Sequence, residues 1–148
     1  MGSTSYSADD YVQRSNFRAA TNTPVFAHTA KMASTPVSQR TVHDTLNPVV
    51  FGASGKLVRE SRDSVDHPNS LAIAVPFDVT GSMGQVPVTV QSKLNTLMSI
   101  LLKKNYCDDP QIMAAAVGDG YTDTGPLQVG QFESGLEIDD CLTNIWLE

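Results

Sequence analysis

The sequence predicts an α/β fold: a partial parallel sheet with flanking helices, preceded by a loop-rich N-terminal extension. Two observations carry this prediction. The second half of the chain alternates uninterrupted apolar runs with an amphipathic helical stretch, which is typical of β-α-β units. The first half is rich in Ser, Thr, Asn, Asp and Pro and has only short apolar pieces. We therefore divide the chain into an extended arm with short strands, residues 1–69, and an α/β part, residues 70–148.

Scattered apolar residues should anchor the arm, either to the second half of the chain or to a neighbouring chain. They are Tyr11, Phe17, Phe26, Val49, Val50 and Phe51. The charged residues of VRESRDS, which are Arg59, Glu60, Arg62 and Asp63, should pair locally or fasten the arm.

The histidines and cysteines carry no metal-type spacing. His28, His43 and His67 are far apart, so we expect surface or local capping roles for them. Cys107 and Cys141 are the chain's two cysteines, and we expect two free thiols in a reducing compartment.

The α/β part begins with a strand and a helix. Leu71 to Val75 is a continuous apolar run, which predicts a short strand covered on both faces. From Val88 to Lys104 the apolar residues recur at steps of three and four, which predicts an amphipathic helix with Pro87 in its first turn. The stripe assigned to the core is Val90, Leu94, Leu97, Met98, Leu101 and Leu102.

A second apolar run, Ile112 to Val117, predicts another buried strand, and Gly118-Asp119-Gly120 ends it. The stretch LQVGQFES predicts one more strand. Ile138, Leu142, Ile145 and Trp146 then suggest a last helix, and Asp139-Asp140 would place negative charge near its N-terminus.

Polar side chains follow both buried strands at the point where each ends. Asp78 ends the first apolar run and Asp119 follows the second. A strand-helix-strand order with two apolar strands predicts a parallel pair. Because the carboxyl ends of parallel strands meet at one edge of a sheet, Asp78 and Asp119 should lie on the same edge.

The stretch DVTGSM is the strongest candidate for chemistry. Asp78, Thr80 and Ser82 form a D-x-T-x-S pattern, which can turn one carboxylate and two hydroxyls towards a common point. Hard cations such as Mg²⁺ prefer oxygen ligands and keep some waters. The alternative is structural: Asp, Thr and Ser also cap free N–H groups at helix N-termini. For Asp119, a turn role competes with a role in holding a metal-bound water.

FDVTGSMG resembles the first motif of the metal-ion-dependent adhesion site (MIDAS) of von Willebrand factor type A (VWA) domains, D-x-S-x-S, with threonine at the first hydroxyl position. The run from RESRDSVDHPNS through DVTGSM to VGDGYTD and PLQVGQFES also looks like a group of VWA proteins in bacteria and their phages. The resemblance implies a Rossmann-like sheet that binds Mg²⁺ or Mn²⁺ through Asp78, Thr80 and Ser82. It also implies a protein partner, often bound through the partner's acidic side chain.

This resemblance covers about half of the chain, so residues 70–148 would form the N-terminal half of a VWA-like domain. The family's later threonine and aspartate have no assigned counterpart here. Three explanations stay open: the chain is a fragment, the rest of the domain is supplied elsewhere, or the fold is a shortened derivative.

Composition and motifs exclude several classes of function. The formal net charge of −6 and the scattered Lys and Arg argue against nucleic-acid binding. No segment reaches the roughly 20 apolar residues of a membrane span, so we expect no membrane partner. The N-terminus, MGSTSYSADDYVQ, has no cationic region followed by an apolar one, so we expect no signal sequence and favour the cytoplasm. No hydrolase elbow, phosphate loop or zinc-protease motif occurs, so we expect no enzyme.

Two functions remain. The first is a VWA-like protein-protein interaction module with a Mg²⁺-dependent site at the carboxyl edge of the sheet. The second is a structural assembly subunit, for instance of a bacteriophage virion, which uses residues 1–69 for contacts and keeps a vestigial metal site. Either could form a homo-oligomer or a larger assembly.

Overall fold

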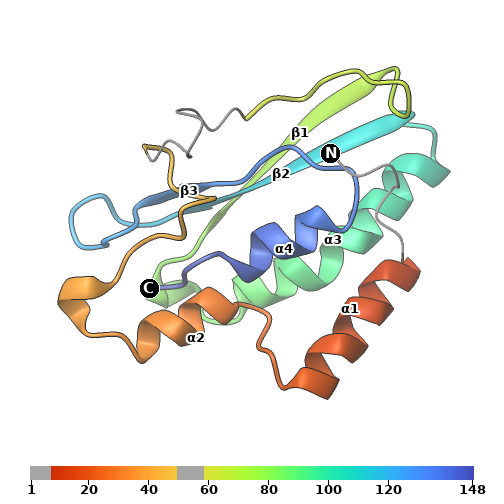
Figure 1. The fold of residues 1–148 in the computed structure, drawn as a ribbon. Helices are drawn as coiled ribbons and strands as arrows, with labels where there is room; N and C mark the ends of the chain where they lie inside the picture. Colours follow the sequence, from red (N-terminus) through yellow and green to blue (C-terminus); the bar gives the residue numbers. More distant parts are fainter. Residues whose placement is uncertain (1–7, 50–58) are drawn as a thin grey trace.

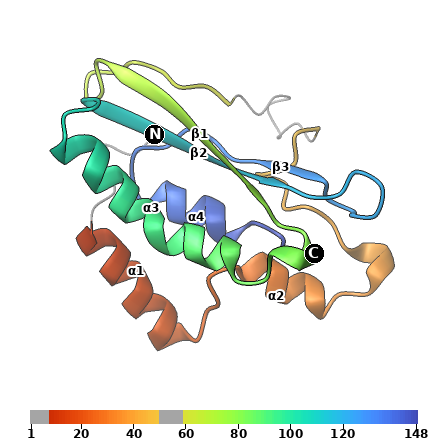
Figure 2. The same cartoon turned by 180° about the vertical axis from the view of Figure 1, so that it is seen from behind.

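The computed structural model describes residues 8–49 and 59–148. Its helices and strands follow in the order α1 (Ala8–Thr21), α2 (Ala27–Ala33), β1 (Ser70–Asp78), α3 (Val86–Lys103), β2 (Asp109–Val117), β3 (Leu127–Val129) and α4 (Glu137–Thr143). The strands form one sheet in the order β1-β2-β3, and the helices gather on one side of it (Figure 1, Figure 2). The predicted α/β class is therefore confirmed.

The sheet is mixed, so the expected parallel sheet is confirmed only for its first pair. β1 and β2 run parallel, with Ser70 opposite Asp109 and Asp78 opposite Val117. β3 runs antiparallel to β2, with Leu127 opposite Val117. The reason lies in the connections: the 18-residue helix α3 can carry the chain back for a parallel strand, whereas the loop between β2 and β3 is too short for such a crossover.

The strand predicted over LQVGQFES is shorter than expected. Regular pairing covers Leu127–Val129, after which single contacts continue along β2. The Gly130 N–H donates to the Ala114 carbonyl at 2.9 Å, and Glu133 forms an isolated antiparallel bridge with Ile112. This segment therefore follows β2 with an interruption in its ladder.

Helix α3 agrees closely with its prediction. It begins at Val86, so Pro87 lies in the first turn, where a missing N–H costs no intrahelical bond. It ends before Asn105, whose φ of 51° is left-handed, a conformation that Asn tolerates better than most residues. Leu97 and Leu101 pack against the core as expected. The side chains of Leu94, Met98 and Leu102 lie outside the described residues.

The N-terminal region differs most from its prediction. Its described residues form helices α1 and α2 and a 3-10 turn over Val37–Gln39, where short strands were expected. Helix α1 lacks a strong apolar stripe: Val12 is 53% exposed and Phe17 is 58% exposed. The helix is instead held by Arg18, whose guanidinium forms a buried ion pair with Asp139 of α4. A contact of this kind leaves no periodic signal in the sequence.

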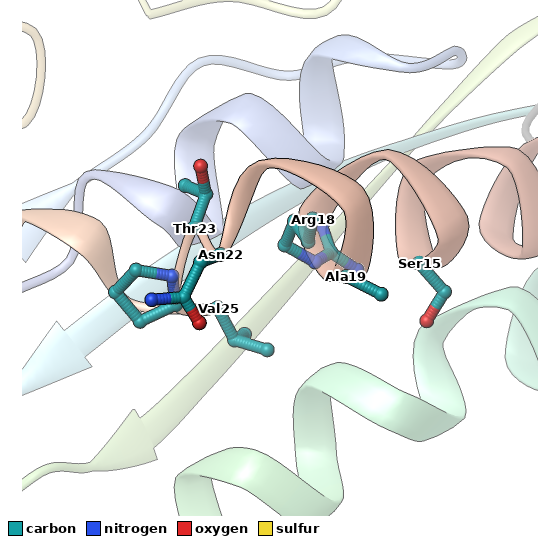
Figure 3. Close-up of a pocket in the computed structure, with 7 residues that line it drawn as sticks. Ser15, Arg18, Ala19, Asn22, Thr23 and Val25 are labelled. Atoms are coloured by element: carbon teal, nitrogen blue, oxygen red, sulfur yellow. The ribbon is translucent and has the colours of Figure 1, made fainter.

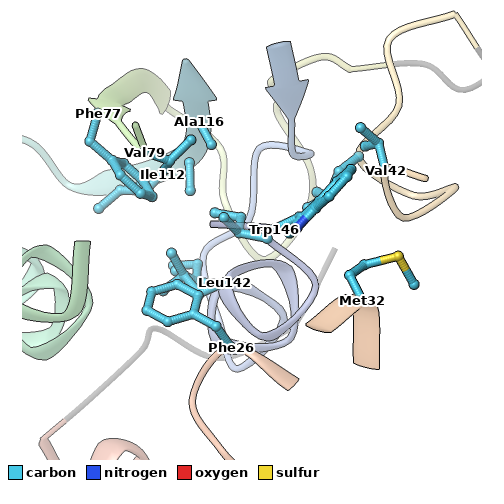
Figure 4. Close-up of a cluster of buried hydrophobic side chains, with 13 residues drawn as sticks. Phe26, Met32, Val42, Phe77, Val79, Ile112, Ala116, Leu142 and Trp146 are labelled. Atoms are coloured by element: carbon cyan, nitrogen blue, oxygen red, sulfur yellow. The ribbon is translucent and has the colours of Figure 1, made fainter. Parts of the chain in front are cut away.

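One hydrophobic core joins the two halves of the chain (Figure 4). Its buried members are Phe26, Met32, Val42 and Leu46 from the N-terminal region, and Phe77, Val79, Ile112, Ala114, Ala116, Ile138, Leu142, Ile145 and Trp146 from the rest. The anchoring role predicted for Phe26 is confirmed. Phe17 and Val49 are exposed, so neither anchors the arm to the second half of the chain, and the alternative of a neighbouring chain stays a prediction for both. The side chain of Tyr11, and Val50 and Phe51, lie outside the described residues.

The two faces of the sheet differ, and this overturns the prediction that the first strand is covered on both faces. Phe77 and its inward neighbours Ile73 and Val75 contact the helix-covered core, and we name this side the inner face. Ala72, Ala74 and Pro76 point the other way, onto the outer face, and are exposed. Because β1 is also an edge strand, one face and one edge of it lack cover from the described residues.

The outer face is covered only in part, by the segment that precedes β1. The buried side chain of Gln111 on β2 accepts from Ser61 Oγ at 2.7 Å and donates to the Arg62 carbonyl at 3.2 Å. Arg59 donates to the Val129 carbonyl at 2.7 Å, and Arg62 pairs with Glu60. The predicted local pairing and fastening roles of these charged residues are confirmed.

The C-terminal segment closes the core beside α4. This helix ends at Thr143, and Ile145 and Trp146 follow it at 1% and 5% exposure. The buried amide of Gln128 bonds both the carbonyl and the N–H of Trp146, at 2.7 and 2.9 Å, and so replaces a strand partner.

Candidate functional site

The candidate site lies where β1 ends, at the carboxyl edge of the parallel pair. Asp78 is the last residue of β1, and the next residue, Val79, donates its N–H to the Val117 carbonyl at 3.0 Å. The chain then makes a 3-10 turn over Gly81–Met83 before α3 begins. Asp78 and Asp119 therefore follow neighbouring strand ends, as the sequence predicted.

The side chains of Asp78, Thr80 and Ser82 are linked in a row. The Thr80 N–H donates to Asp78 Oδ1 at 2.7 Å, and the hydroxyls of Thr80 and Ser82 lie 3.0 Å apart. Both contacts are exposed. The two hydroxyls thus lie together, whereas Asp78 Oδ1 accepts from a main-chain N–H, a contact that a purely structural role would also use.

Hydrogen bonding lowers the pKa of the candidate carboxylate, Asp78. Bonds from the Thr80 hydroxyl and from the Thr80 N–H hold the pKa of Asp78 below its ordinary value of 3.8. Asp78 is consequently ionised at neutral pH, which is the form that a cation requires.

The donor set suits a small hard cation. Two ligands at right angles, each about 2.1 Å from Mg²⁺, would be about 3.0 Å apart. The Thr80 and Ser82 hydroxyl oxygens have that separation, 3.0 Å. One carboxylate and two hydroxyls would occupy one side of an octahedral ion and leave the other positions to water or a partner.

A glycine shapes the turn that follows these donors. Gly84 has φ of 51° and ψ of −110°, a conformation that side chains with a Cβ rarely adopt. It lets the chain reverse from the donor loop into α3 within a few residues.

Asp119 is turned towards its own loop. Its Oδ1 accepts from the Tyr121 N–H at 2.7 Å, and its N–H donates to Asp123 Oδ2 at 2.6 Å. These bonds form a local turn. A turn role was the structural alternative to a role of Asp119 in holding a metal-bound water. The contacts of Asp119 are thus with its own loop, and none joins it to Asp78.

Sequence reasoning missed Glu148 at this edge. Its carboxylate accepts from the N–H groups of Thr124 and Gly125 at 2.9 and 2.6 Å, and its carbonyl oxygen would lie 3.6 Å from a Cβ added at Gly81. The last residue therefore lies between the loops that follow β1 and β2, and both ribbon views place the C-terminus beside the end of β1 (Figure 1, Figure 2). No local pattern signals this long-range contact.

A second polar cluster lies at the opposite end of the parallel pair. His67 Nε2 lies 3.0 Å from Ser134 Oγ, and His67 Nδ1 lies 3.3 Å from Asp109 Oδ1. This order of groups is that of a hydrolase triad, but Ser134 is 1% exposed and His67 is 5% exposed, so a substrate cannot reach the hydroxyl. Among the described residues, the cluster joins three segments that are distant in the chain.

The expectation of surface or local capping roles is therefore wrong for His67, and also for His28, because both rings are buried and bond residues distant in the chain. His28 is 7% exposed and bonds the Thr41 carbonyl through Nε2 at 2.8 Å. Both rings are buried because the N-terminal region packs into the core, which sequence spacing does not reveal.

A cavity of about 590 Å³ lies beside α1 and the loop that follows it (Figure 3). Its lining residues are Ser15, Arg18, Ala19, Asn22, Thr23, Pro24 and Val25. None of the predicted site residues lines it, and the guanidinium of Arg18 is engaged by Asp139. It therefore adds no group to the candidate metal site.

A smaller cavity of about 320 Å³ contains acidic groups and a thiol. Glu133, Glu137, Asp140 and Cys141 are among its lining residues. Burial raises the pKa of Glu133 and raises the pKa of Cys141 to about 12. The thiol is thus protonated and inert at neutral pH, and both Cys107 and Cys141 are free, as expected.

Comparisons with known proteins add no relative: no protein-family model, curated protein or solved structure matches this chain. Within residues 8–49 and 59–148, no three His, Cys, Asp or Glu side chains gather as a metal-binding group; the candidate site relies on hydroxyls instead. No helix in the same ranges is long and apolar enough to cross a membrane.

Proposed function

We propose that this protein is a VWA-like protein-protein interaction module with a Mg²⁺-dependent, MIDAS-type site at the carboxyl edge of its sheet. Asp78 would hold the cation or one of its waters, and Thr80 and Ser82 would complete the near side. The proposal is carried by one observation. In an exposed loop, the hydroxyl oxygens of Thr80 and Ser82 lie 3.0 Å apart, and the ionised carboxylate of Asp78 bonds the same loop.

The charge of this donor set suggests the chemistry of the partner. One carboxylate neutralises half of the charge of Mg²⁺ or Mn²⁺, and hydroxyls add none, so the bound ion keeps a positive charge. The chain itself carries −6, which would repel an acidic partner in the absence of the ion. Association through a partner's acidic side chain would therefore depend on the cation.

Asp119 keeps a supporting role in this proposal. Its carboxylate bonds Tyr121 within its own loop, two residues beyond the end of β2. From there it could hold a water bound to the ion without touching the ion itself.

Calorimetric titration of Mg²⁺ and Mn²⁺ into the protein tests the metal site. We expect binding heats from the wild type and none from Asp78→Ala. Asp66→Ala is the matched control, because it removes an exposed aspartate outside the candidate loop. Equal heats from the wild type and Asp78→Ala would exclude the site.

One observation favours the second function, a virion or other assembly subunit. Helix α1 exposes Val12 and Phe17, and Val37 further along the N-terminal region is 74% exposed. These side chains could contact other subunits while the metal motif stays vestigial. Solution size with and without a chelator separates the two proposals: chelator-sensitive association supports the first, and chelator-insensitive oligomers support the second.

Both proposals assign binding and not catalysis, without nucleic-acid or membrane partners. The first places the protein in the cytoplasm, and the second in a virion.

A further inference from the structure

Two histidine rings meet where helix α2 packs against the segment that follows it. The rings of His28 and His43 lie edge to face, with their centroids 5.2 Å apart. His28 is buried on α2, and His43 is half-buried. His28 Nε2 lies 2.8 Å from the Thr41 carbonyl, so this nitrogen carries a proton, because a carbonyl oxygen can only accept. The pair therefore joins α2 to residues 41–43.

The contacts of His43 require an unprotonated Nδ1. The Thr45 N–H donates to this nitrogen at 3.4 Å, and the Thr45 hydroxyl oxygen lies 2.8 Å from it. Asn144 Nδ2 donates to the same hydroxyl oxygen at 3.4 Å, so the hydroxyl can give its own proton to His43. Nδ1 of His43 thus accepts from Thr45, which is the local capping role predicted for this histidine.

Charged and titratable groups reach His43 and its partner Thr45 from several parts of the chain. They are His28 and Lys31 on α2, Asp44 next in the chain, Arg59 on the Thr45 carbonyl, and Glu133, Glu137 and Asp140 in the cavity that Thr45 also lines. Burial and the charges of His28 and Lys31 hold the pKa of His43 below its ordinary value of 6.5, and Asp44 opposes them. His43 is consequently neutral at pH 7, the form that its hydrogen bonds require.

The turn that begins at His43 carries part of the core. The His43 carbonyl accepts from the N–H groups of Leu46 and Asn47 at 2.8 and 3.0 Å. Leu46 is 2% exposed, and its carbonyl accepts from the Val129 N–H of β3 at 2.8 Å. Val42, just before the turn, is buried as well. The position of this turn therefore fixes two members of the core and one contact of β3.

Val42 extends this connection to Trp146, and both are labelled in Figure 4. A Cβ added at Gly125 would lie 2.4 Å from Val42 Cγ2 and 3.6 Å from Trp146 Cε3, so the two side chains meet at this glycine. The Gly125 N–H also donates to Glu148 at 2.6 Å. A displacement of residues 41–47 would therefore uncover Trp146, the one tryptophan of the chain, and reach the loop that Glu148 holds.

We propose that His28 and His43 form a pH-sensitive latch, which holds residues 41–47 against the core while His43 is neutral and releases them when His43 takes up a proton. Protonation turns Nδ1 into a donor that faces the Thr45 N–H, and it places a positive charge beside the His28 ring and Lys31. Both effects favour release. The inference does not depend on metal binding at Asp78.

The direction of the pH effect follows from proton binding. Because the pKa of His43 is lowered in the folded chain, the released form binds a proton first as the pH falls below 6.5. The latch therefore stabilises the closed form fully above pH 6.5 and loses this effect as the pH falls towards the lowered pKa.

Hydrogen exchange of the full chain, followed by NMR near neutral pH and at about pH 5.5, tests the latch. Protection factors allow for the intrinsic pH dependence of exchange. For the amides of Leu46, Asn47 and Val129 we expect them to fall about tenfold on acidification, the effect of losing one hydrogen bond of ordinary strength. The Ile112 amide, which bonds the Glu133 carbonyl, should keep its protection. Trp146 emission should move to longer wavelength over the same pH range.

Three variants separate the proton from the hydrogen bonds. His43→Asn keeps an acceptor for the Thr45 N–H and does not titrate, so its pH response should vanish. His28→Gln keeps a donor for the Thr41 carbonyl and removes the neighbouring ring, so its response should weaken. Glu133→Gln is the matched control, because burial raises the pKa of this carboxyl towards the same range, and it should respond like the wild type.

Nitrogen-15 NMR of the wild-type imidazoles adds a test without substitution: at neutral pH the His43 ring should carry its proton on Nε2. A proton on Nδ1 overturns the proposal, and so does protection at Leu46 that does not change with pH or falls equally at Ile112. A response that persists in His43→Asn, or disappears in Glu133→Gln, overturns it as well.

Discussion

The two ends of the parallel pair each carry an aspartate, and the structure uses them differently. At the amino end, Asp109 accepts from the Asn69 N–H at 3.0 Å and faces the buried ring of His67. At the carboxyl end, Asp78 is exposed and contacts its near neighbour Thr80. The first carboxylate joins distant parts of the chain, whereas the second is bonded within its own loop.

This difference separates groups that stabilise the fold from groups that are available for binding. A buried polar group that loses its partner keeps the full cost of desolvation, while an exposed one regains water. Changes among the buried polar residues should therefore lower the free energy of unfolding, and changes in the Asp78 loop should alter binding with little effect on stability.

The largest expected effect comes from Arg18→Ala. This change leaves the Asp139 carboxylate, in a residue 2% exposed, without its guanidinium partner. We expect the free energy of unfolding to fall by about 3–5 kcal/mol in urea denaturation. Arg14→Ala is the matched control on the same helix: its pair with Asp140 is exposed, so the loss should be at most about 1 kcal/mol. Equal losses for both variants would contradict the burial argument.

The next effect is expected for His67→Ala. The change removes the ring that contacts both Asp109 and Ser134, so we expect a loss of about 2–3 kcal/mol. Urea denaturation measures this loss, and calorimetry of the folded variant should give unchanged Mg²⁺ heats. If His67→Ala kept its stability but lost Mg²⁺ binding, the assignment of stability to the amino end of the sheet and of binding to its carboxyl end would be contradicted.

A smaller effect is expected for Thr80→Val, which keeps the side-chain shape and removes the hydroxyl. We expect Mg²⁺ affinity to fall about tenfold and stability to change by less than about 0.5 kcal/mol. Thr89→Val removes an exposed hydroxyl of α3 and serves as the control. Affinity unchanged in Thr80→Val would remove that hydroxyl from the proposed ligands.

The smallest effect concerns pH. The pKa of Asp78 is lowered in the folded chain, so the contribution of its hydrogen bonds to stability is present above pH 3.8 and is lost as pH falls through the folded pKa. In Thr80→Val the side-chain bond that lowers this pKa is absent. NMR titration of the Asp78 carboxyl carbon should show a higher pKa in Thr80→Val than in the wild type, whereas Thr89→Val should leave it unchanged.

Local patterns were sufficient for α3, for the β1–β2 pair and for the place of Asp78. The apolar spacing from Val88 to Lys104 and the two apolar runs depend on neighbours in sequence, and such signals are readable without a structure. The side-by-side ends of β1 and β2 follow from the helix that connects them.

The same patterns failed where distant segments meet. Helix α1 is fixed by Arg18 through a residue 121 positions away, and Glu148 bonds a loop 23 and 24 positions away. The apolar run of β1 suggested cover on both faces, yet composition alone does not tell a central strand from an edge strand with small outward side chains.

By itself, the sequence determined an α/β chain with one carboxylate and two hydroxyls just past the first strand, because hydrophobic periodicity and residue order are local properties. Only the tertiary structure decided that the N-terminal region is helical and shares the core, that β3 runs antiparallel, and that β1 lies at an open edge. Those outcomes depend on which distant surfaces exclude water together, and the order of residues does not specify that directly.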